Sequence, residues 1–288
     1  MMQGHIGHVL STILFTLTLN QVFYASFFGS ELAKPQPESQ RPNDETMKAR
    51  KKTAVCMIVK NEEMYLDEFV DYHHALGFDN FFVYDNTEGF EMKQWGKLKG
   101  DHVQVVPFPG EAMQLKAYAE CVRILAADTT FEWVAFLDPD EFLVLKKHSH
   151  VADMLEEYCP KGSIGVNWFV FPNNGWNLPA PEPMTRRFLY REVEPNPYIK
   201  TIARVPDIIE TKVNNVIPHN FVVTRNSTIR DTNGKHIHGQ LNPGGPTDVA
   251  IIHHYKQKSA KEYVLKRMRG RANMILNHPM IQKDVKIA

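Results

Sequence analysis

The chain has 288 residues, 43% of them hydrophobic, and its 33 Lys and Arg residues balance its 33 Asp and Glu residues. This length allows one large hydrophobic core or two small ones. A net charge of zero argues against a protein that binds nucleic acid through an overall positive field. Cys56, Cys121 and Cys159 show neither CxxC spacing nor an even count, so no disulfide framework or structural zinc site is indicated, although one disulfide with a leftover thiol stays open.

Residues 6–28 carry no charged side chain and are long enough to cross the hydrocarbon core of a bilayer. The alternative is a cleaved signal peptide, but Phe23 and Tyr24 stand where small residues precede a cleavage site. We therefore expect residues 1–28 to be a membrane anchor or signal, with a secreted product if the segment is cleaved. Residues 29–52 have little to bury and predict a disordered stem, which leaves residues 53–288 as the globular domain.

The globular part alternates short apolar runs, typical of buried strands, with amphipathic segments, typical of helices. In chain order we expect a strand at 53–60, a helix within 61–78, strands at 80–86 and 102–108, a helix at 112–128 and a strand at 132–137. This order predicts an α/β domain with a mostly parallel sheet and right-handed crossovers.

The rest of the chain predicts fewer elements. We expect strand, loop and strand over 165–191, a strand over 249–255, and a final helix capped by Ser259. In that helix the spacing of Tyr263, Leu265 and Met268 predicts an apolar face against the sheet, with the basic residues in water.

Polar side chains follow three of the predicted strands. In open α/β sheets ligands bind outside the carboxyl ends of the strands, so these side chains are candidates for one common site. For each group alone, ordinary helix capping or turn formation is the alternative. The groups are Lys60, Asn61 and Glu62; Asp85 and Asn86; and Asp138, Asp140 and Glu141.

The third group is unusual because it places three carboxylates within four positions, directly after the unbroken apolar run 133–137. Crowded carboxylates repel one another, which is costly unless a cation or an array of donors neutralises them. A polar loop that caps the next helix is the alternative. We interpret the apolar run as a central strand with a cation site at its tip.

Three stretches together resemble glycosyltransferase family 92 and the related family 2-like enzymes. They are VCMIVKNEEMYLDEFVDYHHALGFDNFFVYDNT, WVAFLDPDEFL and IIHHYKQKSAKEYVLKRMRGRA, which extend from Val55 to Ala272. The resemblance implies a GT-A fold, that is a Rossmann-like, mostly parallel sheet flanked by helices, as a single catalytic domain after the N-terminal membrane segment. It also implies a secretory-pathway enzyme, with the Golgi favoured.

The activity that this resemblance implies is metal-dependent transfer of a hexose, with galactose favoured, from a UDP-sugar to a hydroxyl of a glycan or glycoconjugate, with inversion. Mn²⁺ or Mg²⁺ would be the metal, since a hard divalent cation stabilises a departing diphosphate. A non-catalytic sugar-binding relative is one alternative. A metal-dependent nucleotidyl or phosphoryl transferase is another, but it would need a second acidic cluster that the sequence does not offer.

Residue roles carry over by position. Asp138-Pro139-Asp140 matches the DxD element, so Asp138 and Asp140 are expected to bind the metal, with Glu141 orienting them. His254 is expected as the third ligand rather than its neighbour His253; the alternative is that both simply end a strand. His219, His236 and His238 are weaker candidates.

The remaining roles are less specific. For the catalytic base we favour Glu182, with Asp207 and Glu210 as alternatives, since inversion needs a carboxylate that takes the acceptor's proton. Trp176 is expected to stack on the acceptor sugar, whereas Trp168 is expected in the core. The residues expected to bind the donor are Lys60, Asn61, Glu62, Asp85, Asn86, Asp138, Arg186 and Lys258.

Overall fold

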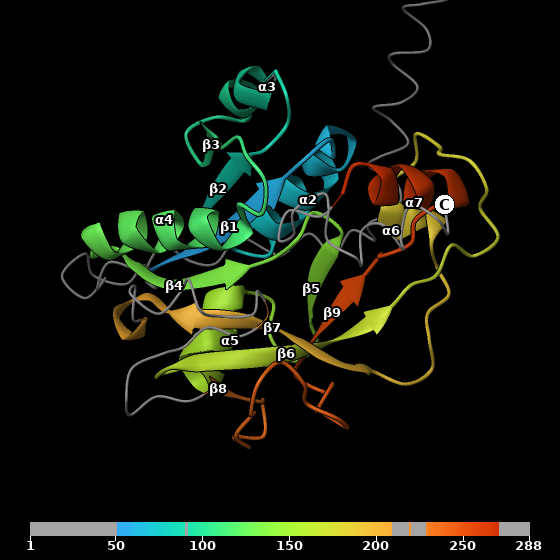
Figure 1. Cartoon of the computed structure of the whole chain (residues 1–288). Helices are drawn as coiled ribbons and strands as arrows, with labels where there is room; N and C mark the ends of the chain where they lie inside the picture. The colour runs from blue at the N-terminus through green and yellow to red at the C-terminus, as the bar shows by residue number, and fades with distance from the viewer. Residues whose placement is uncertain (1–50, 90–91, 209–218, 220–228, 271–288) are drawn as a thin grey trace, which may run out of the picture. The chain divides into compact units, whose positions relative to one another are not determined.

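The computed structural model describes residues 51–89, 92–208, 219 and 229–270 (Figure 1). The predicted membrane segment and the stem up to residue 50 lie outside the described residues. In the described part, no helix is long and apolar enough to cross a membrane. The chain divides into two compact units between Ala49 and Arg50, and every described residue belongs to the second unit.

Four parallel strands form the first half of the sheet, in the order β3-β2-β1-β4. They are β1 (Lys52–Val59), β2 (Asn80–Asp85), β3 (Val103–Pro107) and β4 (Phe131–Phe136), close to the predicted positions. Every residue of β4 is buried, as its apolar run predicts for a strand covered on both faces.

Helices cover both faces of this half. Residues of α2 (Glu63–Ala75) and α5 (Val151–Tyr158) belong to one core cluster, and residues of α4 (Gln114–Ala127) belong to a second cluster. Two further features were not predicted, α5 itself and α3 (Met92–Lys99), because eight residues are too few for a clear helical period. The crossovers and the parallel strands of this half confirm the α/β prediction.

The second half of the sheet departs from the predicted parallel arrangement. It continues from β4 in the order β7-β6-β9-β5, with β8 beside β6. Here β7 runs antiparallel to both β4 and β6, and β5 runs antiparallel to β9. Because β6 still runs parallel to β8 and β9, the α/β sheet is wholly parallel in its first half and mixed in its second. The strands are β5 (Glu141–Leu145), β6 (Ser163–Val170), β7 (Asn196–Arg204), β8 (Ile229–Arg230) and β9 (Ala250–His254).

The segment after β6 was predicted wrongly in part. Instead of a second strand, residues 184–187 form the short helix α6 (Met184–Arg187), and the next strand begins only at Asn196. Pro179, Pro181 and Pro183 precede α6, and proline cannot donate to a sheet ladder, so the chain between them stays irregular.

The final helix, α7 (Ala260–Met268), starts as predicted, with Ser259 and Glu262 forming a reciprocal capping box. The prediction of its apolar face was wrong. Leu265 is 53% exposed and Met268 is 61% exposed, whereas Glu262 is buried. The reason is that α7 packs through ionic contacts, as the site shows below. The three cysteines are buried and free, so no disulfide forms.

The side chain of His73 links α2 to β5 through a hydrogen bond. Its Nδ1 lies 2.8 Å from the carbonyl oxygen of Phe69, and its Nε2 lies 3.2 Å from the backbone nitrogen of Leu143 in β5. The Leu143 N–H must donate, so Nε2 accepts and Nδ1 carries the proton. Burial lowers the pKa of His73 to about 3, which keeps the ring neutral for this role.

Candidate functional site

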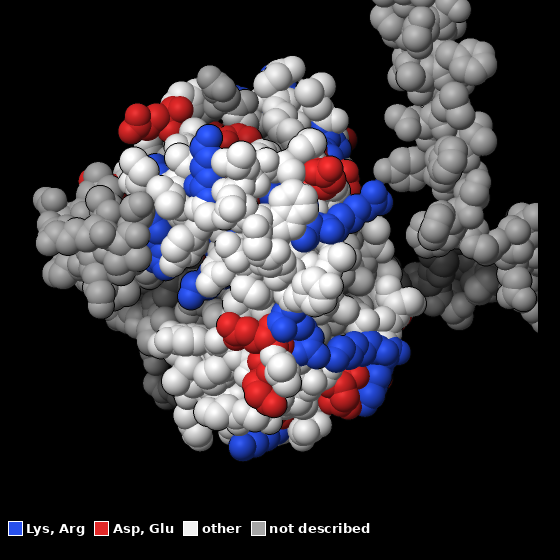
Figure 2. Space-filling model, turned by 90° about the vertical axis from the view of Figure 1, so that its right-hand side faces the viewer, with Lys and Arg blue, Asp and Glu red and all other residues white. Residues whose placement is uncertain are grey.

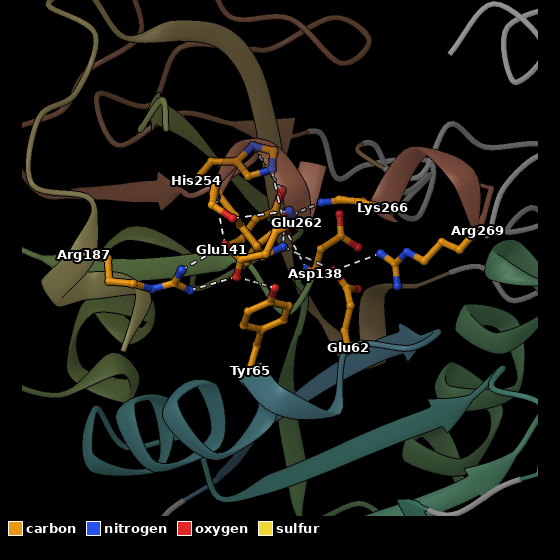
Figure 3. A network of polar contacts seen from close by, with 12 residues as sticks. Glu62, Tyr65, Asp138, Glu141, Arg187, His254, Glu262, Lys266 and Arg269 are labelled. Atoms are coloured by element: carbon orange, nitrogen blue, oxygen red, sulfur yellow. Dashed lines mark hydrogen bonds and ion pairs between the residues drawn. The ribbon is translucent and has the colours of Figure 1, made fainter. Parts of the chain in front are cut away.

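We call Asp138, Asp140 and Glu141 the acidic tip. Asp138 and Asp140 lie in the tight connection between β4 and β5, and Glu141 is the first residue of β5. Figure 3 labels Asp138 and Glu141. The backbone N–H of Asp138 donates to Glu141 Oε2 at 2.9 Å, and the N–H of Glu141 donates to the Asp138 carbonyl at 3.0 Å. Pro139 fixes its own φ between them. The local sequence thus holds three carboxylates at the end of a central strand.

Three lysines neutralise the acidic tip. Lys200, from β7, places its Nζ 2.9 Å from Asp138 Oδ2 and 2.9 Å from Glu141 Oε2. Lys258 lies 3.0 Å from Asp140 Oδ2, and Lys266, from α7, also pairs with that oxygen. Segments far apart in sequence therefore meet at the tip, as Figure 3 shows for Lys266.

These ion pairs decide the charge of each carboxylate. Burial alone would raise the pKa of Asp138, but the Lys200 ammonium outweighs it and lowers that pKa. Burial opposes ionisation of Asp140 in the same way, yet Lys258 and Lys266 hold its pKa well below the usual range. For Glu141, burial dominates and raises the pKa to about 8. At neutral pH the tip therefore has two firmly ionised carboxylates and one that holds its proton easily.

His254, the last residue of β9, is the histidine that faces the tip. Its Nε2 lies 3.7 Å from Asp140 Oδ1, and its Nδ1 lies 3.8 Å from Glu141 Oε1. Burial lowers its pKa to about 3, so the imidazole is neutral. The ring of His253 packs against Phe171 instead, with centroids 4.7 Å apart.

The donor set of the tip suits a divalent cation in part. Asp140 Oδ1, Glu141 Oε1 and His254 Nδ1 are buried and have no hydrogen-bond partner. Carboxylate oxygen and imidazole nitrogen are ligands that Mn²⁺ accepts. However, within the described residues no group of three His, Cys, Asp or Glu side chains is placed to hold a metal ion. Lysines engage Oδ2 of both Asp138 and Asp140, whereas the unpartnered Oδ1 of Asp140 lies 3.7 Å from His254 Nε2.

Glu62, at the end of β1, is linked to the tip through Lys258. The Lys258 Nζ lies 3.3 Å from Glu62 Oε1 and 4.5 Å above the ring of Tyr65. Arg269 reaches the same Glu62 oxygen at 2.9 Å. Lys258 is itself buried and has a left-handed backbone, with φ of 56°, which turns the chain into α7.

A buried clamp joins α6, α2 and α7 around Glu262. Arg187 donates to both carboxylate oxygens of Glu262, at 2.9 and 3.0 Å, and the Tyr65 hydroxyl donates at 2.7 Å. The backbone N–H of Ser259 donates at 2.9 Å. These contacts make the inner face of α7 ionic, and Lys258 and Lys266 pair with Asp140 of the tip. Figure 3 shows Glu262 between Arg187 and Tyr65.

A cavity of about 450 Å³ opens between the end of β1, the start of α2 and α7. Its lining combines two acidic and three basic side chains of the site with an apolar set from α2 and α7. Figure 2 views the unit from the side on which α7 lies in Figure 1, and charges of both signs are interspersed there on a mainly uncharged surface. The lining residues are Asn61, Glu62, Met64, Tyr65, Pro179, Lys258, Glu262, Leu265, Lys266, Met268 and Arg269.

Asp85 and Asn86, the candidate donor-binding residues after β2, make different contacts. Asp85 is buried; its Oδ1 accepts from the Thr87 N–H at 2.8 Å, and its Oδ2 has no partner, so burial raises its pKa. Asn86 donates to the carbonyls of Phe108 and Gly110, so its amide secures the loop after β3 rather than facing a ligand.

The three candidate residues after β1 also differ in their surroundings. Lys60 is half-buried, and Glu62 is buried in the contacts above. Asn61 is exposed with φ of 50°, and its N–H donates to Thr87 Oγ1 at 3.1 Å. Of these three, Asn61 and Glu62 line the cavity.

The predicted acids and arginine downstream do not join the acidic tip. Glu182 and Arg186 are exposed on the segment around α6. Asp207 accepts from the Gly162 N–H and pairs with Arg204, whose backbone lies opposite Trp133. Asp207 is therefore near the start of β4, at the other end of the sheet. Trp168 is buried, as predicted, while Trp176 is 37% exposed.

Sequence reasoning missed Lys200, Lys266 and the role of Glu262 in the clamp. The role of Lys200 could have been inferred from the sequence, because this lysine interrupts the apolar run of β7. A lysine buried there without a charged partner would be costly. The role of Lys266 could not have been inferred in this way, because basic residues are common in surface helices.

The family model of glycosyltransferase family 92 matches residues 51–282, which includes both the acidic tip and the clamp. The chain belongs to glycosyltransferase family 92. Its family 92 relatives include a protein of Oryza sativa subsp. japonica, 28% identical over 65% of this chain and 32% of the relative. A protein of Ricinus communis is 25% identical over 77% of this chain and 38% of the relative. This family 92 chain thus spans about a third of the length of these relatives.

Among solved structures, one resembles this family 92 chain over less than half its length. It is the glucosyl-3-phosphoglycerate synthase from Mycobacterium tuberculosis in complex with Mn²⁺, uridine diphosphate and glucosyl-3-phosphoglycerate. The match has 16% identity and covers 44% of this chain and 46% of that one, with a TM-score of 0.28. A likeness this slight carries no argument about the fold or the site.

Proposed function

We propose that this chain is a glycosyltransferase that moves a hexose from a UDP-sugar to a hydroxyl of a glycan or glycoconjugate, assisted by Mn²⁺ or Mg²⁺. The observation that carries the proposal is the cavity of about 450 Å³ beside the acidic tip. It lies at the carboxyl end of the parallel strand β1, and the carboxyl ends of strands are the usual ligand position in such sheets. Family membership supports the class of reaction.

The cations of the cavity suit a diphosphate. Lys258, Lys266 and Arg269 line it, and the Nε and Nη1 of Arg269 are buried without a hydrogen-bond partner. Basic side chains bind phosphate oxygens through strong charge-assisted hydrogen bonds. We infer that these three side chains bind the diphosphate of the donor and stabilise the negative charge that develops as it leaves.

Asp140 and His254 would hold the divalent cation. When bound, this cation would neutralise part of the charge on the departing diphosphate. The neutral state of His254 and the ionised state of Asp140 are the forms that ligate metals. Asp138 and Glu141 complete the acidic tip around them.

The finer features of the reaction are further parts of the proposal. Glu182 is exposed three positions after Pro179, which lines the cavity, so it is our candidate for the base that takes the proton of the acceptor hydroxyl. Inversion and the preference for galactose rest on the family resemblance. We also propose a secretory-pathway membrane, with the Golgi favoured, as the location, from the apolar segment at residues 6–28.

The test is binding and slow hydrolysis of a panel of sugar nucleotides by the full chain, with Mn²⁺ and with EDTA. We expect one donor to bind and turn over only with Mn²⁺. Asp140→Asn should weaken that binding about 100-fold or more, because it removes a charge that would hold the metal. Asp248→Asn is the matched control, since Asp248 is exposed and pairs with Lys147, away from the acidic tip.

An unchanged donor affinity in Asp140→Asn would contradict the assignment of the site. A folded protein that binds none of the donors would favour the non-catalytic sugar-binding alternative.

A further inference from the structure

Lys200 is a fully buried cation fixed in the middle of the sheet. Its side chain is 0% exposed, and its Nζ lies 2.9 Å from both Asp138 Oδ2 and Glu141 Oε2. A buried ammonium is tolerated only when it is paired with opposite charge. Here the partners are two of the three carboxylates of the acidic tip.

The position of Lys200 is set by the backbone. Its strand, β7, lies between β4 and β6, and Ile202 stands opposite Ala135 of β4. In an antiparallel pair, two residues earlier on β7 means two residues later on the partner, which brings Lys200 level with Leu137, next to Asp138. The strand register therefore fixes the backbone of Lys200 beside the tip.

The cations on Asp140 are held differently. Lys258 precedes α7 and Lys266 lies on it, and the side chain of Lys266 is 30% exposed. Neither belongs to a central strand, so both can give way to another cation more easily than Lys200 can. Asp140 Oδ1 and His254 Nδ1 also lack hydrogen-bond partners.

We propose that Lys200 is a resident cation of the acidic tip, which holds Asp138 and Glu141 in place without metal and leaves Asp140 and His254 as the ligands for a divalent cation. Lys200 is then a positioning residue. The inference rests on the proposed function only in assuming that a divalent cation binds at this tip.

The test compares thermal unfolding and Mn²⁺ binding of the full chain with those of Lys200→Met. Loss of the ammonium leaves the buried Glu141 and the partly exposed Asp138 without their cation, so we expect the Tm to fall by roughly 10 °C. Mn²⁺ should now take over their neutralisation. The rise in Tm that Mn²⁺ produces should therefore be at least about twice that of the wild type, and Mn²⁺ affinity, measured by electron paramagnetic resonance, should increase.

Arg204→Met is the matched control. Arg204 belongs to the same strand and pairs with Glu132 of β4, but at the opposite end of the sheet. We expect this variant to lose stability as well, and to gain from Mn²⁺ only as much as the wild type does. Equal gains in Lys200→Met and Arg204→Met would overturn the inference and leave Lys200 a purely structural lysine.

If Lys200→Met does not fold, the double variant Lys200→Met/Asp138→Asn replaces it in the test. This variant removes both charges of the ion pair between Lys200 and Asp138. It should fold and gain no more from Mn²⁺ than the wild type does; a larger gain would overturn the role of Asp138. Mn²⁺ binding by Lys200→Met but not by the wild type would contradict the inference, because Asp140 and His254 should bind the ion with Lys200 in place. A third outcome is that neither the wild type nor Lys200→Met binds Mn²⁺ while the wild type still turns over a donor. That outcome would overturn the inference about Lys200 and leave the proposed transferase function intact.

Discussion

Glu262 decides how the C-terminal part of the site is held. Its buried carboxylate accepts from Arg187, Tyr65 and Ser259, and these three come from α6, α2 and the cap of α7. Burial alone would raise the pKa of Glu262, but the hydrogen bonds from Arg187, Ser259 and Tyr65 lower it to about 2 from 4.5. The ionised form of Glu262 therefore stabilises the fold.

We expect this stabilisation to depend on pH in a defined direction. Because the pKa of Glu262 is lower in the folded chain than in the unfolded one, its contribution is complete above about pH 4.5 and is lost as the pH falls towards 2. Glu262→Gln should reduce the free energy of unfolding by about 3 kcal/mol at pH 7, with the difference shrinking through this window. Urea unfolding at several pH values measures it.

Glu156→Gln provides the control for Glu262→Gln, since Glu156 is exposed on α5. Its difference from the wild type should be small and flat with pH. A Glu262→Gln difference that stays constant from pH 7 to pH 3 would mean that Glu262 is not the titrating group.

At the scale of single residues, the sequence predicted the acids better than their partners. Asp138, Asp140 and His254 do converge, because a strand tip and a strand end are readable from local patterns. Lys200, Lys258 and Lys266 approach them through a strand pairing and a helix packing that depend on the whole fold. The predicted donor contact Asn86 is instead used to secure a loop.

At the scale of elements, α7 shows why periodicity alone can mislead. Leu265 and Met268 lie three apart and share one side of the helix, while Glu262 and Lys266 lie four apart and share another. Both spacings are helical, and hydrophobicity favoured the first as the inner face. The structure has the second facing inward, because Arg187 and Asp140 supply opposite charges there.

The mixed second half of the sheet has a similar cause. The parallel strands β1 to β4 are separated by crossovers, and two of the crossover helices, α2 and α4, are visible in the sequence. The partners of β7 and β9 are instead fixed by long-range pairing. Local patterns gave the positions of β6 and β9 there, but they gave neither the positions of β5, β7 and β8 nor the neighbours of any strand.

The orientation of α7 predicts the effect of a surface substitution. Leu265→Gln should change the free energy of unfolding by less than about 0.5 kcal/mol, because the side chain is 53% exposed. Leu155→Gln, the same change at a fully buried position of α5, should cost about 3 kcal/mol. Urea unfolding of both variants measures this. If the two variants lost equal stability, α7 would pack through its apolar side after all.

At the scale of the whole molecule, the site draws on most of the described fold. The end of β1, the tip between β4 and β5, β7, β9 and α7 all contribute a side chain. All of these belong to the unit that begins at Arg50, and the family match begins at residue 51. The folding and the chemistry of the site should therefore be separable from residues 1–50.

A chain that starts at Lys51 tests this separation together with the proposed anchor. Because residues 51–288 hold every described contact of the site, their Tm and Mn²⁺-dependent donor binding should match those of the full chain, with Tm within about 2 °C. In cells the full chain should sediment with membranes, and the shortened one should not. Leu14→Arg/Leu17→Arg should release the full chain too, since charges in an apolar span are costly, whereas Gln40→Arg should not. A full chain that never sediments with membranes would refute the anchor and leave the site assignment unaffected. A shortened chain that fails to fold would refute the independent folding of the second unit.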